Sequence, residues 1–472
     1  MSTYIDVTPA SGKALLLLGA FDIGSVGYVA EEFFISGTAS SYVPKEELGP
    51  DGRWDVTPSG TADYTTRIVA ITPTDPAHFN GTALVEWLNV SGGIDAPAVW
   101  MMAHREIVRT GYAYVAVSVQ KVGIDGGASL LGMDMSLKAQ DPARYGSLHH
   151  PGDAFAYDIF SQAGELVRDR GDGILGGLHP QHVIGIGESQ SAMFLTTYVN
   201  AVDPLARVYD GFLVHSRFGP AAPLDGVSLI EDLDSSSGPQ DAVEFRPNLR
   251  VPLLAVITET DLFGHVPLGY YSARQPDNEW LRVWEIPGAA HADNYTIQVA
   301  PIDSGSAPLA DIVAAYAPTN MLMGQQLDHY INFGPQHHYV VHAAIAALDR
   351  WVRTGEPAPS AAPIAVSETE PRHPILDANG LAEGGIRTPW VEVPIARTSG
   401  VSTDENIMAA IFGSGESFDA DTLRRLYPGG APEYLERFTD ALDASIRGGF
   451  ILAADRAEIL DLAAATYPGD RS

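Results

Sequence analysis

Ser189 is the first candidate for a reactive residue, because it lies at the centre of residues 187–191, which read Gly-Glu-Ser-Gln-Ser. A buried-strand pattern over 183–186 precedes this pentapeptide, and a helical pattern follows it from residue 192. A strand, a sharp turn with a serine at its apex and a helix together form a nucleophile elbow. The first and last positions of the turn must be small, because strand and helix nearly touch there. The pattern therefore predicts a nucleophilic Ser189, with a structural turn serine as the alternative.

A serine hydroxyl is a poor nucleophile at neutral pH, so it needs a general base that is itself oriented by a carboxylate. His291 is the predicted base: it follows the predicted strand 281–286, and small residues before it leave room for the ring. The alternative interpretation of His291 is a loop histidine whose ring is hydrogen-bonded to backbone groups. Two carboxylates, Asp261 and Glu259, follow the strand 251–257, and the chain order serine, acid, histidine is that of nucleophile-elbow enzymes. Asp261 is favoured because it lies farther beyond its strand, whereas Glu259 remains the second candidate for the acid.

Acyl transfer also requires N–H donors for the oxygen that becomes negative. One predicted donor is the backbone N–H of Gln190, at the start of the helix after the nucleophile. The second is expected from the loop 88–93, where Asn89 and Val90 are the candidates and two glycines allow close approach of backbone to a ligand. An ordinary strand-to-helix turn is the alternative, and the sequence leaves open which N–H points inward.

The elements around these residues alternate between strand and helix. Strand patterns are found at 82–90, 112–119, 182–187, 211–214, 251–257 and 281–286, helical patterns at 96–110, 151–170, from 191 and over 342–353, and antiparallel strands at 27–43 and 64–73. This alternation predicts an α/β fold with a mostly parallel, doubly wound sheet and helices on both faces. Reactive residues are then expected on loops at the carboxyl ends of the strands.

Two irregular stretches, near 216–250 and 296–340, interrupt the alternation. Irregular stretches of this length are typical of binding loops or lids. The alternative is that they are surface loops with no role in binding. Aromatic residues in or near them could line an acyl or alcohol pocket, although ordinary packing is the favoured interpretation of each alone: Phe218, Tyr270, Tyr271, Tyr295, Tyr330 and Tyr339. A Pro/Ala-rich linker, 356–364, then divides a predicted catalytic domain (1–355) from a C-terminal extension (356–472).

The extension has few aromatic residues and would form a thin core alone, so we expect it to pack on the catalytic domain. Its pattern predicts a strand at 390–394 and helices at 417–426, 432–446 and 455–466.

The amino-acid composition disfavours some classes of binding partner and excludes some kinds of chemistry. The 472 residues contain 28 Lys and Arg against 59 Asp and Glu, a net charge of −31, which disfavours nucleic acids and anionic membrane surfaces as partners. The absence of cysteine excludes disulfides, thiolate nucleophiles and cysteine-based zinc sites. The leucine run 15–18 is too short for a signal core or a membrane span, so a cytoplasmic location is expected by default.

No cofactor and no metal are expected. Residues 171–176 match G-x-G-x-x-G, but they follow a helix and precede a strand, the reverse of a dinucleotide-binding unit. The adjacent histidine pairs at 149–150 and 337–338 are poorly arranged for chelating one metal ion, and the chain contains neither a P-loop nor H-E-x-x-H.

With these residues, the chain resembles the α/β-hydrolase superfamily and, more narrowly, the bacterial proteins described as alpha/beta hydrolase domain-containing. The matching stretches are 27–33, 79–82, 85–91, 187–191, 259–261, 291–293 and 384–389, which span nearly the whole chain. The resemblance implies the hydrolase fold and esterase chemistry, and it leaves the substrate open. Ser191 departs from the usual glycine of the superfamily and matches the form of this subgroup.

The reading that follows is a serine hydrolase that cleaves a small-molecule carboxylic ester through an acyl-enzyme, with Ser189, His291 and Asp261 or Glu259 as its triad. An acyltransferase, lactonase or amidase would use the same triad, so these activities stay open. A non-catalytic binding protein on the same fold is a further alternative, because fold does not imply function. The oligomeric state is not indicated.

Overall fold

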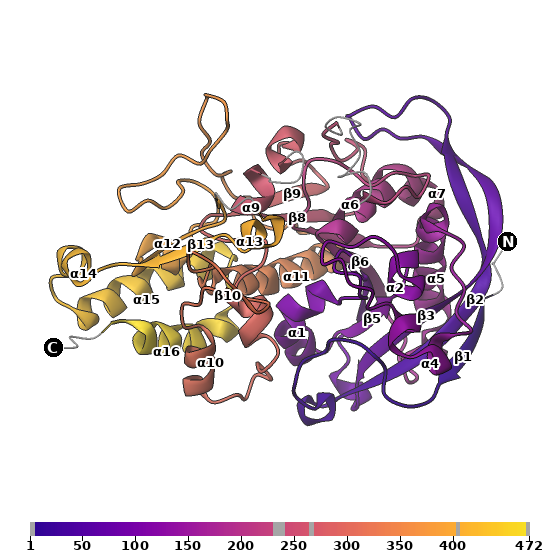
Figure 1. The fold of residues 1–472 in the computed structure, drawn as a ribbon, viewed down its shortest axis with the longest axis horizontal. Coiled ribbons are helices and arrows are strands. Elements are labelled where there is room, and N and C mark those ends of the chain that lie inside the picture. The colour runs from indigo at the N-terminus through magenta and orange to yellow at the C-terminus, as the bar shows by residue number, and fades with distance from the viewer. Residues whose placement is uncertain (1–4, 230–240, 264–268, 403–405, 469–472) are drawn as a thin grey trace.

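The computed structural model of the protein describes residues 5–229, 241–263, 269–402 and 406–468. Its centre is a nine-stranded sheet in the order β1-β2-β3-β5-β4-β6-β7-β8-β9 (Figure 1). The strands are β1 (Asp6–Ala10), β2 (Tyr28–Pro44), β3 (Val56–Pro73), β4 (Thr82–Trp87), β5 (Ala113–Val117), β6 (His182–Glu188), β7 (Gly211–His215), β8 (Leu253–Thr258) and β9 (Leu281–Ile286). The strands from β5 to β9 in this order are parallel, and β1, β2 and β3 are antiparallel at one edge. The predicted mostly parallel sheet is confirmed.

The parallel strands are covered on both faces, which explains their largely apolar sequences. Every residue of β4, β5, β7 and β8 is buried. The longer helices that cover them are α1 (Ala98–Thr110), α5 (Ala156–Ile174), α6 (Gln190–Thr197) and α11 (Gln336–Thr354). Helices α1 and α11 share one apolar cluster with Ile184 and Leu213, whereas α5 and α6 share another with the neighbouring Val183 and Phe212. Neighbouring residues of a strand point to opposite faces, so the predicted helices on both faces are confirmed.

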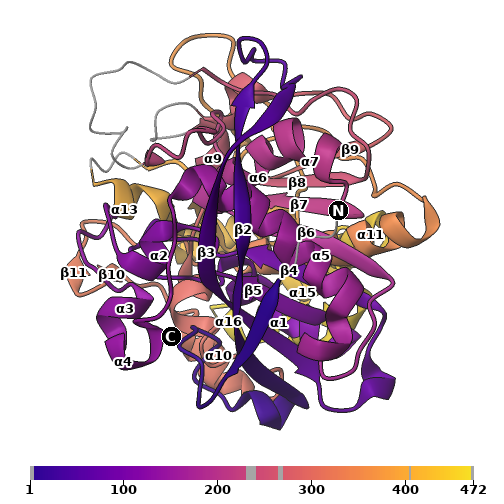
Figure 2. The ribbon, with the colours of Figure 1, turned by 90° about the vertical axis from the view of Figure 1, so that its right-hand side faces the viewer.

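The antiparallel edge is a long hairpin formed by β2 and β3. Tyr28 pairs with Pro73 at one end and Pro44 with Val56 at the other. Figure 2 shows these two strands, in indigo, running nearly the height of the molecule. The functional candidates lie on loops of the parallel strands.

Shorter elements fill the connections. They are α2 (Lys121–Asp125), α3 (Leu137–Gln140), α4 (Pro142–Tyr145), α7 (Asp203–Ala206), α9 (Glu259–Phe263), α10 (Leu309–Ala315), β10 (Met321–Leu322) and β11 (Gln325–Gln326). The predicted insertion 216–250 includes residues 230–240, which lie outside the described residues. The second insertion, 296–340, holds α10 and the hairpin β10–β11.

Helix α11 begins inside that second insertion, at Gln336, and not at 342 as its apolar pattern predicts. Its first turn is polar, which hides the helix from a search for apolar periodicity. Gln336 and His337 are nevertheless fully buried, because their side chains find hydrogen-bond partners at Gly288, in the loop after β9, and at His215, the last residue of β7.

The C-terminal segment consists mainly of helices. Its elements are α12 (Pro389–Glu392), β12 (Ala396–Ser399), α13 (Ile407–Ile411), β13 (Ser414–Ser417), α14 (Ala420–Leu426), α15 (Ala431–Gly448) and α16 (Arg456–Thr466). The strand expected at 390–394 is wrong. Pro389 occupies the first turn of α12, where its fixed φ favours a helix, and the paired strand is β12, antiparallel to β13.

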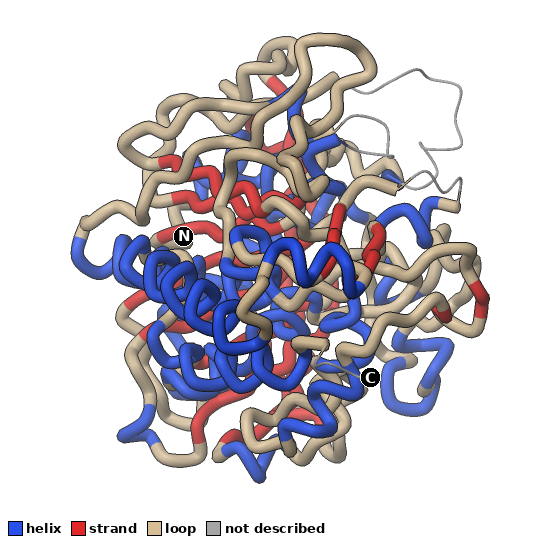
Figure 3. The backbone as a smooth tube through the Cα atoms, turned by 90° about the vertical axis from the view of Figure 1, so that its left-hand side faces the viewer, coloured by secondary structure: helices blue, strands red, loops and turns tan. Residues whose placement is uncertain are grey.

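The described residues of the C-terminal segment, 356–402 and 406–468, pack against the sheet domain. In Figure 1 the yellow helices α14, α15 and α16 lie at the end of the molecule opposite β2, and in Figure 3, seen from that end, helices lie in front of the strands. Arg105 on α1 forms an ion pair with Glu458 on α16 at 2.8 Å, which links the segment to the core. Among the described residues, no helix has the length and apolarity needed to cross a membrane.

Candidate active site

Ser189 lies at the apex of a sharp turn between β6 and α6. Its φ of 60° and ψ of −121° place it in a region that non-glycine residues rarely adopt, as a nucleophile elbow requires. A Cβ at Gly187 would lie 3.2 Å from the Ser191 carbonyl oxygen, so this position favours glycine. The Ser191 hydroxyl donates to the Glu188 carbonyl oxygen at 2.7 Å and accepts from the Glu188 N–H at 3.1 Å. The serine that replaces the usual glycine therefore bonds across the turn.

The structure brings Ser189, His291 and Asp261 together at the carboxyl edge of the sheet, where they follow β6, β9 and β8, respectively. Nε2 of His291 is 2.8 Å from the Ser189 hydroxyl oxygen, and Nδ1 is 2.6 Å from Oδ1 of Asp261. The other carboxylate oxygen of Asp261 accepts a hydrogen bond from the Thr258 N–H at 2.7 Å. This geometry fits an imidazole whose Nδ1–H donates to Asp261 and whose Nε2 accepts the serine proton.

Burial and charge act in opposite directions on this pair. Burial would raise the pKa of Asp261, but the charge and hydrogen bond of His291 and the Thr258 amide hold that pKa below its ordinary value. Burial would lower the pKa of His291, but the charge and hydrogen bond of Asp261 hold that pKa above its ordinary value. The Asp261 carboxylate therefore stabilises an imidazolium at this position.

Glu259, the other candidate acid, has its hydrogen bonds elsewhere. Its carboxylate accepts from the Gly288 N–H, from the Gly400 N–H at 2.9 Å and from the Ser399 hydroxyl at 2.9 Å. Burial raises its pKa, and these three donors oppose the rise. Glu259 thus joins the loop that leads to His291 with the C-terminal segment.

The candidate oxyanion donors differ in what they bond. Gln190 is the first residue of α6, so its N–H has no acceptor within the helix. The Val90 N–H donates to the side-chain oxygen of Gln190 at 3.2 Å, whereas the Asn89 N–H donates to the Ala96 carbonyl oxygen at 3.0 Å. The Asn89 side chain donates to the Glu188 carbonyl oxygen at 3.1 Å. Asn89 therefore joins the end of β4 to the elbow, and Val90 presents its N–H toward Gln190.

Glu188 was not singled out by sequence reasoning, although an acidic residue next to the serine was the available signal. One of its carboxylate oxygens lies 3.5 Å from Nε2 of His291. The pKa of Glu188 is raised to about 7, because burial and the charge of Asp261 raise it more than His291 and the hydrogen bond from Asn89 lower it. On the other side, the ring of Phe218 stacks on His291, with centroids 5.3 Å apart. His291 is thus enclosed by two carboxylates and an aromatic ring.

A buried histidine pair beneath the elbow was also missed. The Ser189 N–H donates to the His215 carbonyl oxygen at 2.9 Å, and Nε2 of His215 is 2.8 Å from Nε2 of His337. Burial lowers the pKa of both rings, that of His337 to about 4, so one neutral ring donates to the other. Asp293, whose pKa burial raises to about 7, lies 3.9 Å from Nδ1 of His337. No group of three or more His, Asp or Glu side chains in the described part of the chain is arranged to hold a metal ion.

The comparisons with known proteins place the chain in a family. It belongs to the α/β hydrolases: the family model described as "Alpha/beta hydrolase domain" matches residues 5–461. No curated protein matches the chain.

Similar solved structures include two esterases and a serine hydrolase. A thermostable esterase from Pseudomonas putida ECU1011 has 11% identity, with 51% of this chain and 66% of that chain covered and a TM-score of 0.26. A lidless serine hydrolase from Xanthomonas campestris has 11% identity, 54% and 86% coverage and a TM-score of 0.29. Acetyl xylan esterase 1 from Thermoanaerobacterium sp. JW/SL YS485 has 10% identity, 60% and 81% coverage and a TM-score of 0.29.

Proposed function

We propose that this α/β hydrolase cleaves a carboxylic ester through an acyl-enzyme formed on Ser189. The observation that carries the proposal is the continuous chain from the Ser189 hydroxyl to His291 at 2.8 Å and from His291 to Asp261 at 2.6 Å. These are the contacts that a serine nucleophile, a general base and an orienting carboxylate require.

In the proposed reaction, Nε2 of His291 takes the proton of the Ser189 hydroxyl while the serine oxygen bonds to the acyl carbon. The carbonyl electron pair moves to oxygen, and the N–H groups of Gln190 and Val90 stabilise that oxyanion. The tetrahedral intermediate collapses, the bond to the alcohol oxygen breaks, and the imidazolium returns its proton to the alcohol. Water then gives a proton to Nε2 of His291 while its oxygen bonds to the acyl carbon. The bond to the Ser189 oxygen breaks, the imidazolium returns its proton to that oxygen, and the acid leaves.

Hydrolysis of p-nitrophenyl esters from acetate to decanoate tests the reaction class, and the chain-length profile sizes the acyl pocket. Labelling by a serine-reactive phosphonate, located by peptide mass spectrometry, tests the nucleophile independently of the substrate. Turnover with a label on Ser189 is expected. Added alcohols that divert the acyl group would reassign the protein as an acyltransferase, and a protein that is neither active nor labelled would contradict the proposal.

The pH dependence of kcat/KM is expected to show an acid limb set by His291. The base must be neutral in the free enzyme, so kcat/KM is low below the pKa of His291 and rises to a plateau above it. Because Asp261 and Glu188 raise that pKa, the limb is expected above pH 6.5, the ordinary value. Glu188→Gln removes the negative charge that this carboxyl carries when it is ionised, and is expected to move the limb to lower pH. An unchanged limb in the variant would show that Glu188 does not act on the imidazole.

The side chain of Gln190 is expected to compete with substrate for the Val90 N–H. Gln190→Ala keeps the backbone donor at 190 and removes the oxygen that accepts from Val90. A net hydrogen bond contributes about 0.5–1.5 kcal/mol, so kcat/KM should rise by up to about tenfold. Gln190→Met, which has no comparable acceptor, should behave like the alanine variant, and Gln190→Glu should not. A fall in kcat/KM in both neutral variants would show instead that the amide binds substrate.

A further inference from the structure

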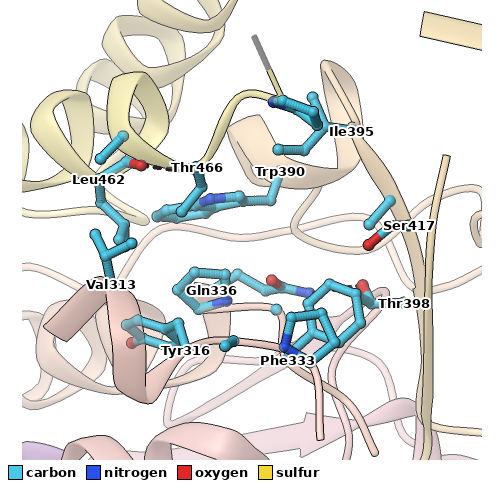
Figure 4. A pocket seen from close by; sticks show the side chains of 17 residues that line it. Val313, Tyr316, Phe333, Gln336, Trp390, Ile395, Thr398, Ser417, Leu462 and Thr466 are labelled. Atoms are coloured by element: carbon cyan, nitrogen blue, oxygen red, sulfur yellow. Dashed lines mark hydrogen bonds between the residues drawn. The ribbon is translucent and has the colours of Figure 1, made fainter. Parts of the chain in front are cut away.

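A cavity lies between the sheet domain and the C-terminal segment. Its volume is about 280 Å³, and its walls come from α10, the start of α11, α12, β12 and α16 (Figure 4). None of the three residues of the proposed triad lines it. Exposed residues such as Ala317 and Ala465 belong to its lining, so the cavity is open to solvent. It is therefore a candidate binding site separate from the serine.

The lining of this cavity is aromatic and uncharged. Tyr316, Phe333 and Trp390 contribute rings, and no Asp, Glu, Lys, Arg or His belongs to the lining. Transfer of a charged group into such surroundings without a partner is strongly unfavourable. The lining therefore selects uncharged molecules.

Volume sets the size of the occupant. A cavity of about 150 Å³ with apolar walls holds one benzene molecule. The present cavity is nearly twice as large, which corresponds to two fused six-membered rings. Trp390 offers a flat surface for such a molecule, and Tyr339 stacks on the indole with an interplanar angle of 6°, which fixes its orientation.

Gln336 supplies the polar end of the cavity. Its side chain is fully buried and lies opposite Trp390 (Figure 4). Nε2 donates to the Gly288 carbonyl oxygen at 2.7 Å and contacts the Thr398 hydroxyl at 3.4 Å. Oε1 has no hydrogen-bond partner among the described residues. A buried acceptor without a donor is destabilising, and a ligand hydroxyl that donates to it would remove that loss.

We propose that this cavity binds an uncharged molecule of two-ring size that carries one hydroxyl group. The rings stack on Trp390, and the hydroxyl donates to Oε1 of Gln336. Binding requires no turnover, so this inference stands or falls independently of the proposed esterase activity.

The test uses three probes on the full-length protein: 2-naphthol, naphthalene and 2-naphthoate, followed by isothermal titration calorimetry and by quenching of tryptophan fluorescence. We expect one molecule of 2-naphthol per chain. Naphthalene, which cannot donate, is expected to bind about tenfold more weakly, and the anionic naphthoate at least 100-fold more weakly. Equal affinity for 2-naphthol and 2-naphthoate, or no binding of 2-naphthol up to its solubility, would overturn the proposal.

Cavity-filling variants test whether 2-naphthol binds in this cavity. Val313→Trp fills the cavity from α10 and is expected to lower the affinity for 2-naphthol at least tenfold. Ala314→Trp is the matched control, because Ala314 is exposed on the same helix and does not line the cavity. Thr466→Phe fills the cavity from α16 and replaces Val313→Trp if that variant unfolds. Unchanged affinity in a folded filling variant would place the probe elsewhere, including at the serine, and would also overturn the proposal.

Discussion

Ser189→Ala is expected to lower kcat by about 10⁴- to 10⁶-fold, because loss of the nucleophile in other serine triads leaves only binding and oxyanion stabilisation. Alanine keeps a Cβ at the same backbone position, so the elbow should form and the melting temperature should change little. The measurement is the rate of p-nitrophenyl ester hydrolysis at enzyme concentrations high enough to detect residual turnover.

Phosphonate labelling of the same variant controls for a contaminating esterase. Wild type should gain the mass of one adduct, and Ser189→Ala should gain none. A variant that retains more than about 1% of wild-type kcat would contradict the assignment of Ser189.

Two conservative substitutions are expected to separate the roles of the two carboxylates after β8. Asp261→Asn should lower kcat by about 10⁴-fold with the fold intact, since the amide cannot hold the imidazole in the required tautomer. Glu259→Gln should retain most of the turnover and lower the free energy of unfolding by about 1–3 kcal/mol. The carboxylate of Glu259 accepts hydrogen bonds from three donors. The NH₂ group of the introduced glutamine would face one of these donors and could not accept from it.

Paired assays of ester hydrolysis and urea unfolding give both quantities for each variant. The opposite pattern, a folded but inactive Glu259→Gln and an active Asp261→Asn, would assign the acid to Glu259. Comparison of the two variants is informative because both side chains are fully buried and lie two residues apart, so burial alone cannot account for a difference.

Local sequence was sufficient to predict those features that depend on residues close together in the chain. The parallel strands are largely apolar because both faces are covered, and this pattern predicts the sheet. Ser189 could be placed at an elbow because strand, turn and helix are contiguous. His291 and Asp261 could be placed near it, because the carboxyl ends of neighbouring parallel strands lie at one edge.

Other features could not be predicted, because they depend on contacts between residues that are far apart in the chain. His337 was considered only as a chelator, whereas its partner His215 lies 122 residues earlier. Glu259 accepts a hydrogen bond from Gly400, which lies 141 residues away. Local sequence therefore could not distinguish Glu259 from Asp261 as the candidate catalytic acid. The polar first turn of α11 and the helical turn at Pro389 likewise depend on burial against distant elements.

The carboxylate of Glu259 also limits how this protein can be recombined with its relatives. Its donors come from the loop before His291 and from Ser399 and Gly400, and a Cβ at Gly400 would lie 2.5 Å from the Thr260 nitrogen. A chimera with a crossover in the linker 356–364 would inherit the acceptor from one parent and two of its donors from the other. Such chimeras should be less stable than either parent when the parents differ at 259, 399 or 400, so these three positions should be exchanged together.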